Sequence, residues 1–272
     1  MDMDTAHIKL KNLKDYLKKL GKVAVAFSGG VDSTFLLMAA HQVLGENVLA
    51  ITARSGLFPK KETNEAIEFT STNGIRHIVC DINELSVDGF AQNPVNRCYL
   101  CKKSLFLTFK KLAADNGFDY LAEGSNVDDD NDYRPGMMAI KELNILSPLK
   151  AMNFKKDDIR LLSREMGLST WKKPSFACLA SRFPYGELIT REKLNIIEKS
   201  EQFLFDLGFK QVRVRYHGDL AKIEVTSGEM DKLLMPDMRE TVCTELKKNG
   251  FSYVAVDLQG YRTGSMNETI GK

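Results

Sequence analysis

A buried strand that runs straight into a glycine turn and a helix constrains this chain more than any other feature. Residues 23–27 form a continuous apolar run, which is typical of a strand covered on both faces. The motif Ser28-Gly29-Gly30-Val31-Asp32-Ser33 follows, and residues 32–44 read as a helix. Further strands and helices then alternate along the chain, with strands expected at 48–52, 76–82 and 120–123 and helices at 60–72 and 101–116. This alternation predicts an α/β fold with a parallel sheet covered by helices on both faces.

The pattern of the chain changes after about residue 168. Residues 171–185 contain proline and serine and show little periodicity. A smaller α+β unit is expected beyond them, with helices at 191–207 and 237–249 and strands at 211–216, 221–226 and 253–258. We therefore predict two domains, residues 1–170 and residues 171–272, with an active site between them.

Composition excludes several classes of protein. The 272 residues are 43% hydrophobic and 27% charged, and the net charge is only +2, which argues against a protein that coats nucleic acid. No apolar run is long enough to span a membrane, and the polar start lacks an apolar signal core. We expect a cytoplasmic protein, in which the five cysteines are thiols or metal ligands rather than disulfides.

The glycine motif has the properties of a phosphate-binding loop. Gly29 and Gly30 allow the backbone to approach a ligand closely, and the helix behind them presents free N–H groups and a positive dipole end. Ser28 and Ser33 add hydroxyl donors, while Asp32 is suited to holding Mg²⁺. The motif differs from the common NTPase loop, which carries a lysine before its last hydroxyl residue. The alternative is an ordinary strand–helix turn with a polar cap.

Two groups of residues after the loop carry further chemistry. Cys98 and Cys101 are three residues apart at an expected helix start, where they could share a metal, form a redox pair or bind an iron–sulfur cluster. Cys178 has cations nearby, which favour the thiolate needed for nucleophilic attack or metal ligation, although a lone cysteine beside alanines is often a buried hydrophobe. Cys80 and Cys243 lie in strand and helix patterns, and we expect them to be core residues.

The second half of the chain offers candidate anion-binding side chains. Arg213 and Arg215 alternate with valines, as in a half-buried strand, so both should point to one side, where they could bind a phosphate bidentately. Glu224 lies on the neighbouring strand and could pair with these arginines or bind a cation. Arg262 is another anion candidate. The alternative for this group is a salt-bridge ladder on the surface.

Together these motifs resemble those of a known family. Ser-Gly-Gly-x-Asp-Ser after a first strand is similar to the PP-loop of ATP pyrophosphatases, whose fold is that of the adenine nucleotide alpha hydrolases. The whole set resembles the LarE-type sulfur transferases, and the resemblance extends from the loop almost to the C-terminus. The motifs that carry it are Asn93-Pro94, Arg97-Cys98-Tyr99-Leu100-Cys101-Lys102, Glu123-Gly124-Ser125-Asn126, Arg134-Pro135-Gly136, residues 175–182 and Gly260-Tyr261-Arg262-Thr263-Gly264-Ser265-Met266-Asn267.

The resemblance implies a reaction with two steps. Such enzymes use ATP to adenylylate a carboxylate of pyridinium-3,5-biscarboxylic acid mononucleotide and then form a thiocarboxylate for the nickel-pincer cofactor of lactate racemase. It implies that Ser28, Gly29, Gly30, Asp32 and Ser33 bind ATP and the departing pyrophosphate, with Mg²⁺ on Asp32. Residues 51–54 would contact adenine, and Arg213, Arg215 and Arg262 would bind the substrate phosphate. We also predict Glu224 as a metal ligand.

The family uses two sulfur sources. One form sacrifices the sulfur of a cysteine at the position of Cys178, whereas the other binds a 4Fe-4S cluster with three cysteines. Because Cys98, Cys101 and Cys178 are all present, the resemblance implies the cluster form, which takes sulfide or another sulfur donor. We also expect a homo-oligomer.

Three other functions remain open from the sequence. A PP-loop tRNA thiolase shares the loop and can use three cysteines, but the near-neutral charge counts against it. An ATP-dependent amidating synthetase would need no cysteines. A nucleotide-binding regulatory module would not release pyrophosphate.

Overall fold

The computed structural model describes residues 3–131, 135–174, 177–262 and 264–269. Four of the motif residues named above, Arg134, Ser175, Phe176 and Thr263, lie outside these ranges. The chain forms two compact units, Met1–Val87 with Asn96–Phe176 and Asp88–Val95 with Ala177–Lys272. The segment Asp88–Val95 thus joins the second unit although it lies within residues 1–170. The predicted domain limits at 170 and 171 stay a prediction.

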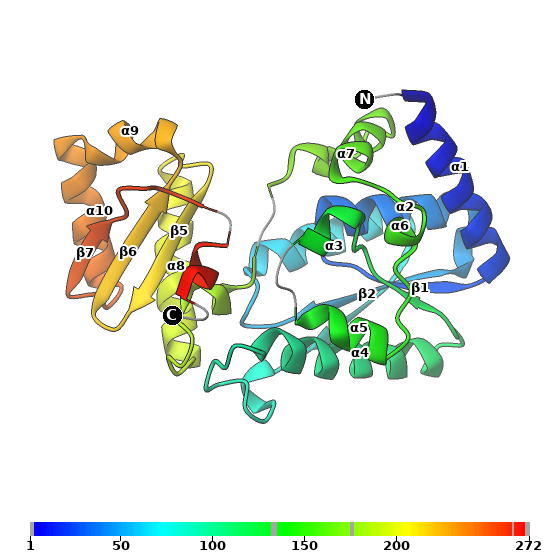
Figure 1. Cartoon of the computed structure of the whole chain (residues 1–272), viewed down its shortest axis with the longest axis horizontal. Helices are drawn as coiled ribbons and strands as arrows, with labels where there is room; N and C mark the ends of the chain where they lie inside the picture. Colours follow the sequence, from blue (N-terminus) through cyan, green and yellow to red (C-terminus); the bar gives the residue numbers. More distant parts are fainter. Residues whose placement is uncertain (1–2, 132–134, 175–176, 263, 270–272) are drawn as a thin grey trace. The chain divides into compact units, whose positions relative to one another are not determined.

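The first unit is an α/β fold, as the sequence predicts (Figure 1). Its sheet has the order β3-β2-β1-β4, and every neighbouring pair is parallel. The strands are β1 (Val23–Ala26), β2 (Val48–Arg54), β3 (Arg76–Asp81) and β4 (Leu121–Ala122). The helices are α1 (Met3–Leu20), α2 (Val31–Leu44), α3 (Lys60–Thr72), α4 (Arg97–Asp115), α5 (Gly136–Glu142), α6 (Pro148–Ala151) and α7 (Lys156–Glu165). Helices α5, α6 and α7 are additions that the sequence patterns did not predict.

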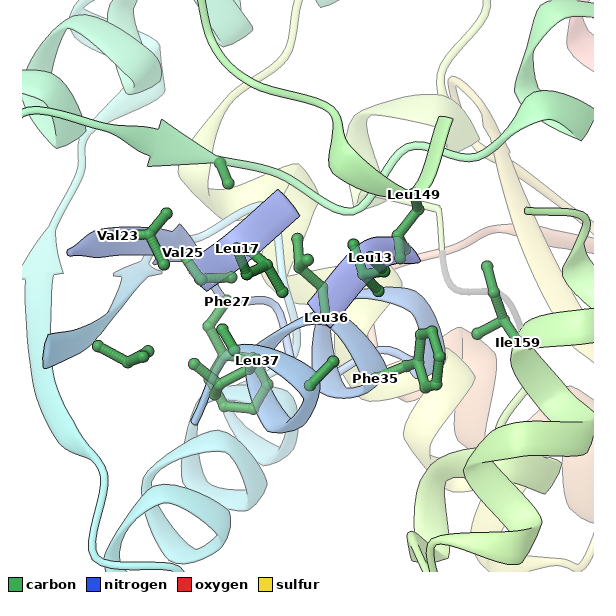
Figure 2. Packing of buried hydrophobic residues seen from close by; sticks show 14 of the residues in the cluster. Leu13, Leu17, Val23, Val25, Phe27, Phe35, Leu36, Leu37, Leu149 and Ile159 are labelled. Carbon is green, nitrogen blue, oxygen red and sulfur yellow. The ribbon is translucent and has the colours of Figure 1, made fainter. Parts of the chain in front are cut away.

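Apolar side chains cover both faces of this sheet. Val23 and Val25 of β1 point to one face and pack in a cluster with Phe35 of α2 and with residues of α1, α6 and α7 (Figure 2). Ala24 points to the opposite face and packs with Phe109 of α4 and residues of α5. Successive side chains of a strand point to opposite faces, so a strand covered on both sides must be apolar throughout. This is why residues 23–27 are a continuous apolar run.

The second unit is the smaller α+β fold that the sequence predicts. Its sheet has the order β5-β6-β7, with β5 and β6 antiparallel and β6 and β7 parallel. The strands are β5 (Val212–His217), β6 (Leu220–Val225) and β7 (Tyr253–Val256), and the helices are α8 (Arg191–Asp206), α9 (Met230–Leu234) and α10 (Pro236–Lys248). Val212 and Val214 are fully buried and form part of the core of this unit.

Candidate functional site

The loop between β1 and α2 is held by its own backbone and hydroxyl groups. Gly29 has a φ of +68°, a conformation that glycine adopts without strain. Ser33 Oγ lies 3.0 Å from Ser28 Oγ and donates a hydrogen bond of 3.2 Å to the carbonyl of Gly30. The N-cap residue of α2 is Gly30, which has no side chain to cap the helix, and its own N–H lies 3.4 Å from Ser28 Oγ. The first N–H groups of this helix are therefore available to an anion such as phosphate.

Asp32 lies in the first turn of α2 and faces a cluster of charged groups. Its carboxylate forms an ion pair with Lys156 Nζ and lies 3.5 Å from Asn126 Nδ2. Burial raises the pKa of Asp32; the Lys156 cation opposes that rise and the nearby Asp129 carboxylate adds to it. A desolvated carboxylate with amide and carboxylate neighbours has the oxygen ligands that suit Mg²⁺.

Gly124 brings a second loop against this helix N-terminus. A Cβ at this position would lie 3.0 Å from Ser33 N and 3.2 Å from the carbonyl carbon of Asp32, so only glycine fits without displacement. The preceding carboxylate, Glu123, is buried and accepts hydrogen bonds from Ser125 Oγ and Ser147 Oγ. Asn126 lies two residues after Gly124 in the chain, so this close approach brings its amide to Asp32.

The end of strand β2 is tied to the strand that leads into the loop. Thr52 Oγ1 donates a hydrogen bond of 2.6 Å to the carbonyl of Phe27, the residue before Ser28. His77 Nε2 lies 2.8 Å from the same hydroxyl, and Thr70 Oγ1 lies 2.8 Å from His77 Nδ1. Burial lowers the pKa of His77, which favours its neutral form. The predicted contact of residues 51–54 with adenine stays a prediction.

In the second unit, the two predicted arginines lie on one face of the sheet. The cross-strand register pairs Arg213 with Glu224 and Arg215 with Lys222, which places all four side chains on that face. The arginines are only 3% and 5% exposed, so the prediction of a half-buried strand is wrong at these residues, and so is the alternative of a ladder on the surface. Later residues of the chain contact both arginines, because the Arg213 guanidinium lies 5.2 Å from the centroid of the Tyr261 ring and Arg215 donates a hydrogen bond to Ser265 Oγ.

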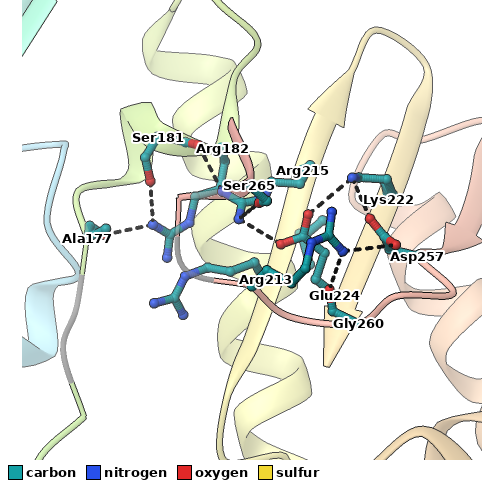
Figure 3. A network of polar contacts seen from close by, with 12 residues as sticks. Ala177, Ser181, Arg182, Arg213, Arg215, Lys222, Glu224, Asp257, Gly260 and Ser265 are labelled. Atoms are coloured by element: carbon teal, nitrogen blue, oxygen red, sulfur yellow. Dashed lines mark hydrogen bonds and ion pairs between the residues drawn. The ribbon is translucent and has the colours of Figure 1, made fainter. Parts of the chain in front are cut away.

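Several cations gather at this buried face with the carboxylates of Glu224 and Asp257 (Figure 3). Arg215 donates hydrogen bonds to Glu224 Oε2 at 2.7 Å, to Ser181 O at 2.9 Å and to Ser265 Oγ at 3.0 Å. Burial and the neighbouring Arg182 cation lower the pKa of Arg213 to about 10. The pairing of Glu224 with an arginine, one of two roles left open by the sequence, is therefore present.

The remaining predicted anion candidate is bound within its own loop. Arg262 Nη1 lies 3.6 Å from Asp257 Oδ1 and 3.3 Å from the carbonyl of Gly260. The sequence patterns did not single out Arg182, which is 1% exposed and donates to both carboxylate oxygens of Glu201 at 2.9 and 2.8 Å. The one sequence feature that could have pointed to Arg182 is its position in residues 175–182, a motif shared with the LarE-type family.

Comparison with known proteins identifies the phosphate-binding loop. A model of the PP-loop domain matches residues 3–165 of this chain. The chain belongs to the PP-loop family. It is 38% identical over 271 residues to the pyridinium-3,5-bisthiocarboxylic acid mononucleotide synthase of Lactiplantibacillus plantarum, a match that covers 99% of this chain and 98% of that protein. The resemblance to the LarE-type members of the family is thereby confirmed.

Two other relatives show how far the similarity extends. An uncharacterized protein of Synechocystis sp. is 40% identical over 97% of this chain and 98% of its own length. A glutamine-hydrolyzing GMP synthase of Aeropyrum pernix is 28% identical over 65% of this chain and 38% of that protein. The match to the PP-loop family supports ATP binding by this chain. The same match, together with the similarity to the mononucleotide synthase, supports the conclusion that the chain is an ATP-dependent enzyme.

Two lysines of the PP-loop site have no signal in the sequence. The sequence patterns did not single out Lys156, and Lys173 is one of the cations near Cys178, to which no other role was given. Lys173 Nζ donates to the carboxylates of Glu62 and Glu65 at 2.7 Å each and to the carbonyl of Gly29 at 3.1 Å. Burial acts to lower the pKa of Lys173, but its two carboxylate partners outweigh that effect and raise it. Both lysines are far from the loop in sequence, so periodicity and spacing could not find them.

The three cysteines of interest belong to different units. Helix α4 begins at Arg97, four residues earlier than predicted, because Tyr99 and Leu100 donate their N–H groups to the carbonyl of Asn96. Cys98 and Cys101 therefore both lie at the start of α4 in the first unit, whereas Cys178 belongs to the second. All five cysteines, including Cys80 and Cys243, are half-buried and form no disulfide, so the last two are not fully in the core.

The thiols have the chemistry that an iron–sulfur cluster requires. Cysteine sulfur is the usual ligand of such clusters, and Cys98 and Cys101 are one helical turn apart. Within the described residues, no three His, Cys, Asp or Glu side chains are grouped so as to hold a metal ion. The donor types therefore fit the cluster, while the full ligand set stays a prediction.

No helix in the described ranges has the length and apolar character to cross a membrane.

Proposed function

We propose that this protein is an ATP-dependent sulfur transferase that converts a carboxylate of a pyridinium dicarboxylate mononucleotide into a thiocarboxylate for nickel-pincer cofactor synthesis. The observation that carries the proposal is the full-length similarity, at 38% identity, to a synthase of the corresponding bisthiocarboxylic acid mononucleotide. The loop geometry and the three cysteines support it. We place the reaction in the cytoplasm, where the thiols stay reduced.

The first step is adenylylation. A substrate carboxylate oxygen attacks the α-phosphorus of ATP, the bond from that phosphorus to the bridging oxygen breaks, and pyrophosphate leaves. The N–H groups at the start of α2 and the hydroxyls of Ser28 and Ser33 hold the pyrophosphate as its charge develops. Asp32 would hold Mg²⁺, which neutralises phosphate charge when bound. Gly29 and Gly30 give the phosphates close access to the backbone.

The second step replaces oxygen by sulfur. A sulfur nucleophile attacks the activated carbonyl carbon, and AMP leaves with the original carboxylate oxygen. Cys98, Cys101 and Cys178 are the residues that would hold a 4Fe-4S cluster, which supplies an exchangeable sulfide when bound. The alternative is that Cys178 gives up its own sulfur and becomes dehydroalanine. The first route needs an external sulfide or sulfur donor, whereas the second consumes the protein.

The buried arginine face of the second unit is the proposed site for the substrate phosphate. Burial and the neighbouring cations of Arg182 and Arg215 lower the pKa of Arg213, and a phosphate dianion would offset that repulsion. Arg262 is proposed to add a further contact from the loop that covers this face. Because Glu224 pairs with Arg215 and Lys222, we propose it primarily as the group that orients Arg215 and only secondarily as a cation ligand.

The test of this function uses protein purified without oxygen. The protein is incubated with ATP, Mg²⁺, sulfide and pyridinium-3,5-biscarboxylic acid mononucleotide, and mass spectrometry measures AMP, pyrophosphate and thiocarboxylate. We expect all three products in equal amounts per transfer. A parallel reaction contains ammonia in place of sulfide, and pyrophosphate release with an amide as the product there, but no thiocarboxylate in the sulfide reaction, would instead favour the amidating synthetase. A homo-oligomer is expected by size-exclusion chromatography with light scattering.

Cysteine variants separate the two sulfur routes. Cys98→Ser, Cys101→Ser and Cys178→Ser should each lose iron, visible absorbance and multiple turnover while adenylylation continues. The rival route predicts a colourless protein that reacts once and loses the mass of H₂S at Cys178. In that case Cys98→Ser and Cys101→Ser would remain active, and the cluster proposal would be wrong.

A further inference from the structure

The peptide bond that leads from β1 into the phosphate-binding loop is held at both of its polar ends. The carbonyl of Phe27 accepts a hydrogen bond of 2.6 Å from Thr52 Oγ1. The N–H of Ser28, on the other side of the same peptide bond, donates one of 3.3 Å to Ser33 Oγ. A peptide unit is planar, so a rotation of its carbonyl also rotates its N–H. The contact of Thr52 with Phe27 therefore affects the hydroxyl of Ser33 in the loop.

The number of available protons fixes the direction of the hydrogen bonds behind Thr52. A carbonyl oxygen can only accept, so the Thr52 hydroxyl gives its single proton to Phe27. In the contact of 2.8 Å between Thr52 Oγ1 and His77 Nε2, the nitrogen must then be the donor. Burial lowers the pKa of His77, and the neutral imidazole that results carries one N–H, so Nδ1 accepts from the Thr70 hydroxyl 2.8 Å away. His77 therefore has the Nε2–H tautomer.

Three elements of the first unit contribute these groups. Thr52 lies in β2, His77 in β3 and Thr70 in the last turn of α3. The two threonines are buried, so water competes little for their hydrogen bonds. The ring of Phe27 also packs against the ring of His77, edge to face, with 6.1 Å between the centroids. His77 thus acts on the residue before the loop both through Thr52 and by direct packing.

We propose that His77 and Thr52 are positioning residues of the nucleotide site, which orient the peptide bond between Phe27 and Ser28 through a relay of hydrogen bonds. The relay runs from His77 Nε2 to Thr52 Oγ1 and from there to the carbonyl of Phe27. Without it this carbonyl is free to turn, and the Ser28 N–H and the Ser33 hydroxyl lose the arrangement that receives phosphate. The inference rests on the proposed function only for the identity of the nucleotide, because the relay and the tautomer are properties of the protein alone.

Nitrogen NMR tests the tautomer in the protein without nucleotide. The chain has four histidines, and the signals of His77 are those that disappear in His77→Gln. At neutral pH, a long-range proton–nitrogen correlation spectrum should show His77 protonated at Nε2 and unprotonated at Nδ1. In Thr52→Val the Nε2–H proton should move to higher field, because the hydrogen bond to the Thr52 hydroxyl is lost. A neutral His77 ring protonated at Nδ1 would overturn the inference.

Affinity measurements test the effect on the nucleotide site. The probe is α,β-methylene-ATP, which cannot be cleaved between its α- and β-phosphorus atoms, and its binding is measured by calorimetry with saturating Mg²⁺. Thr52→Val keeps the shape of the side chain but removes the hydroxyl, so the Kd should rise about tenfold, the effect of one lost hydrogen bond. Thr52→Ser restores the hydroxyl and should bind as tightly as the wild type. Adding His77→Phe to Thr52→Val should weaken binding no further, because both substitutions break the same relay.

A control variant separates this role from a general loss of stability. Phe109→Leu leaves a cavity on the opposite face of the sheet, where Phe109 packs with Ala24, and should lower the stability in urea without changing the affinity. The inference is overturned if Thr52→Val binds the analogue as tightly as the wild type, if Thr52→Ser binds it as weakly as Thr52→Val, or if Phe109→Leu weakens binding as much as Thr52→Val. A wild-type protein that does not bind the analogue at all would instead contradict the proposed function, and the tautomer of His77 would still test the relay.

Discussion

The close approach of Gly124 to the helix α2 N-terminus allows a sharp test of how the PP-loop site is built. Gly124→Ala adds one methyl group where a Cβ would lie 3.0 Å from Ser33 N and 3.2 Å from both Ser33 Cα and the carbonyl carbon of Asp32. The φ of Gly124 is not in the left-handed region, so the backbone itself tolerates alanine. The effect of the substitution therefore comes from contact alone.

The structure gives the size of this effect. Each of these distances is shorter than an ordinary van der Waals contact, and all three atoms belong to the main chain, which cannot rotate away. The loop and the helix must separate by a few tenths of an ångström, and overpacking of this kind costs about 1–3 kcal/mol of unfolding free energy. A similar displacement of the PP-loop should raise the Kd for α,β-methylene-ATP about tenfold, because phosphate contacts depend on sub-ångström positions.

The assay combines urea unfolding with calorimetric titration of the nucleotide analogue. The matched control is Gly228→Ala, since a Cβ at Gly228 meets no atom within 4 Å and its backbone conformation also accepts alanine. The control should leave nucleotide affinity unchanged and shift stability by less than about 0.5 kcal/mol. If Gly124→Ala behaves like this control in both measurements, the reasoning from the close approach is refuted.

Three further substitutions test other contacts. Glu201→Gln should lower the unfolding free energy by about 3–5 kcal/mol in urea, because it leaves the buried guanidinium of Arg182 without its charge partner; a loss below about 1 kcal/mol would contradict this. Burial lowers the pKa of His77 in the folded chain, so His77 contributes stability above its ordinary pKa of 6.5 that is lost as the pH falls below that value. The stability difference between the wild type and His77→Gln should therefore narrow on acidification, and a constant difference would count against it. Lys173→Met should weaken binding of the ATP analogue several-fold and lower the unfolding free energy by about 1–3 kcal/mol, because two glutamates lose their cation and the Gly29 carbonyl loses a donor. Lys172→Met is the control, and equal effects of the two substitutions would refute this role of Lys173.

Local sequence patterns were sufficient to predict the strands that form the sheet and the phosphate-binding loop. The apolar run at 23–27, the glycines after it and the helix behind them are adjacent in sequence, so each could be inferred from its neighbours. The register of Arg213 and Arg215 on one side of a strand follows from the same alternation. The helices α5 and α6 have only seven and four residues, too few to show a helical repeat of their own. Helix α7 has ten residues and an amphipathic pattern that buries Ile159 and Leu162, so its sequence did carry a helical signal that the prediction left out.

The burial of charged side chains and the identity of their partners could not be inferred from local sequence patterns. Arg213 and Arg215 look like residues of a half-exposed strand, and it is their contacts with Tyr261 and Ser265, about fifty residues later in the chain, that help to bury them. Likewise, nothing in the sequence around Lys156 or Lys173 distinguishes them from the many surface lysines, since their partners lie more than a hundred residues away in the chain.

The sequence by itself therefore determined the fold class and the phosphate-binding loop, because a strand, a glycine turn and a helix N-terminus are contiguous and their chemistry is local. Only the tertiary structure decided which cations neutralise the site, which glycine admits a second loop to it and which charged side chains are buried. These properties depend on groups that are distant in sequence and are brought within a few ångströms by folding, where desolvation makes each charge require a partner.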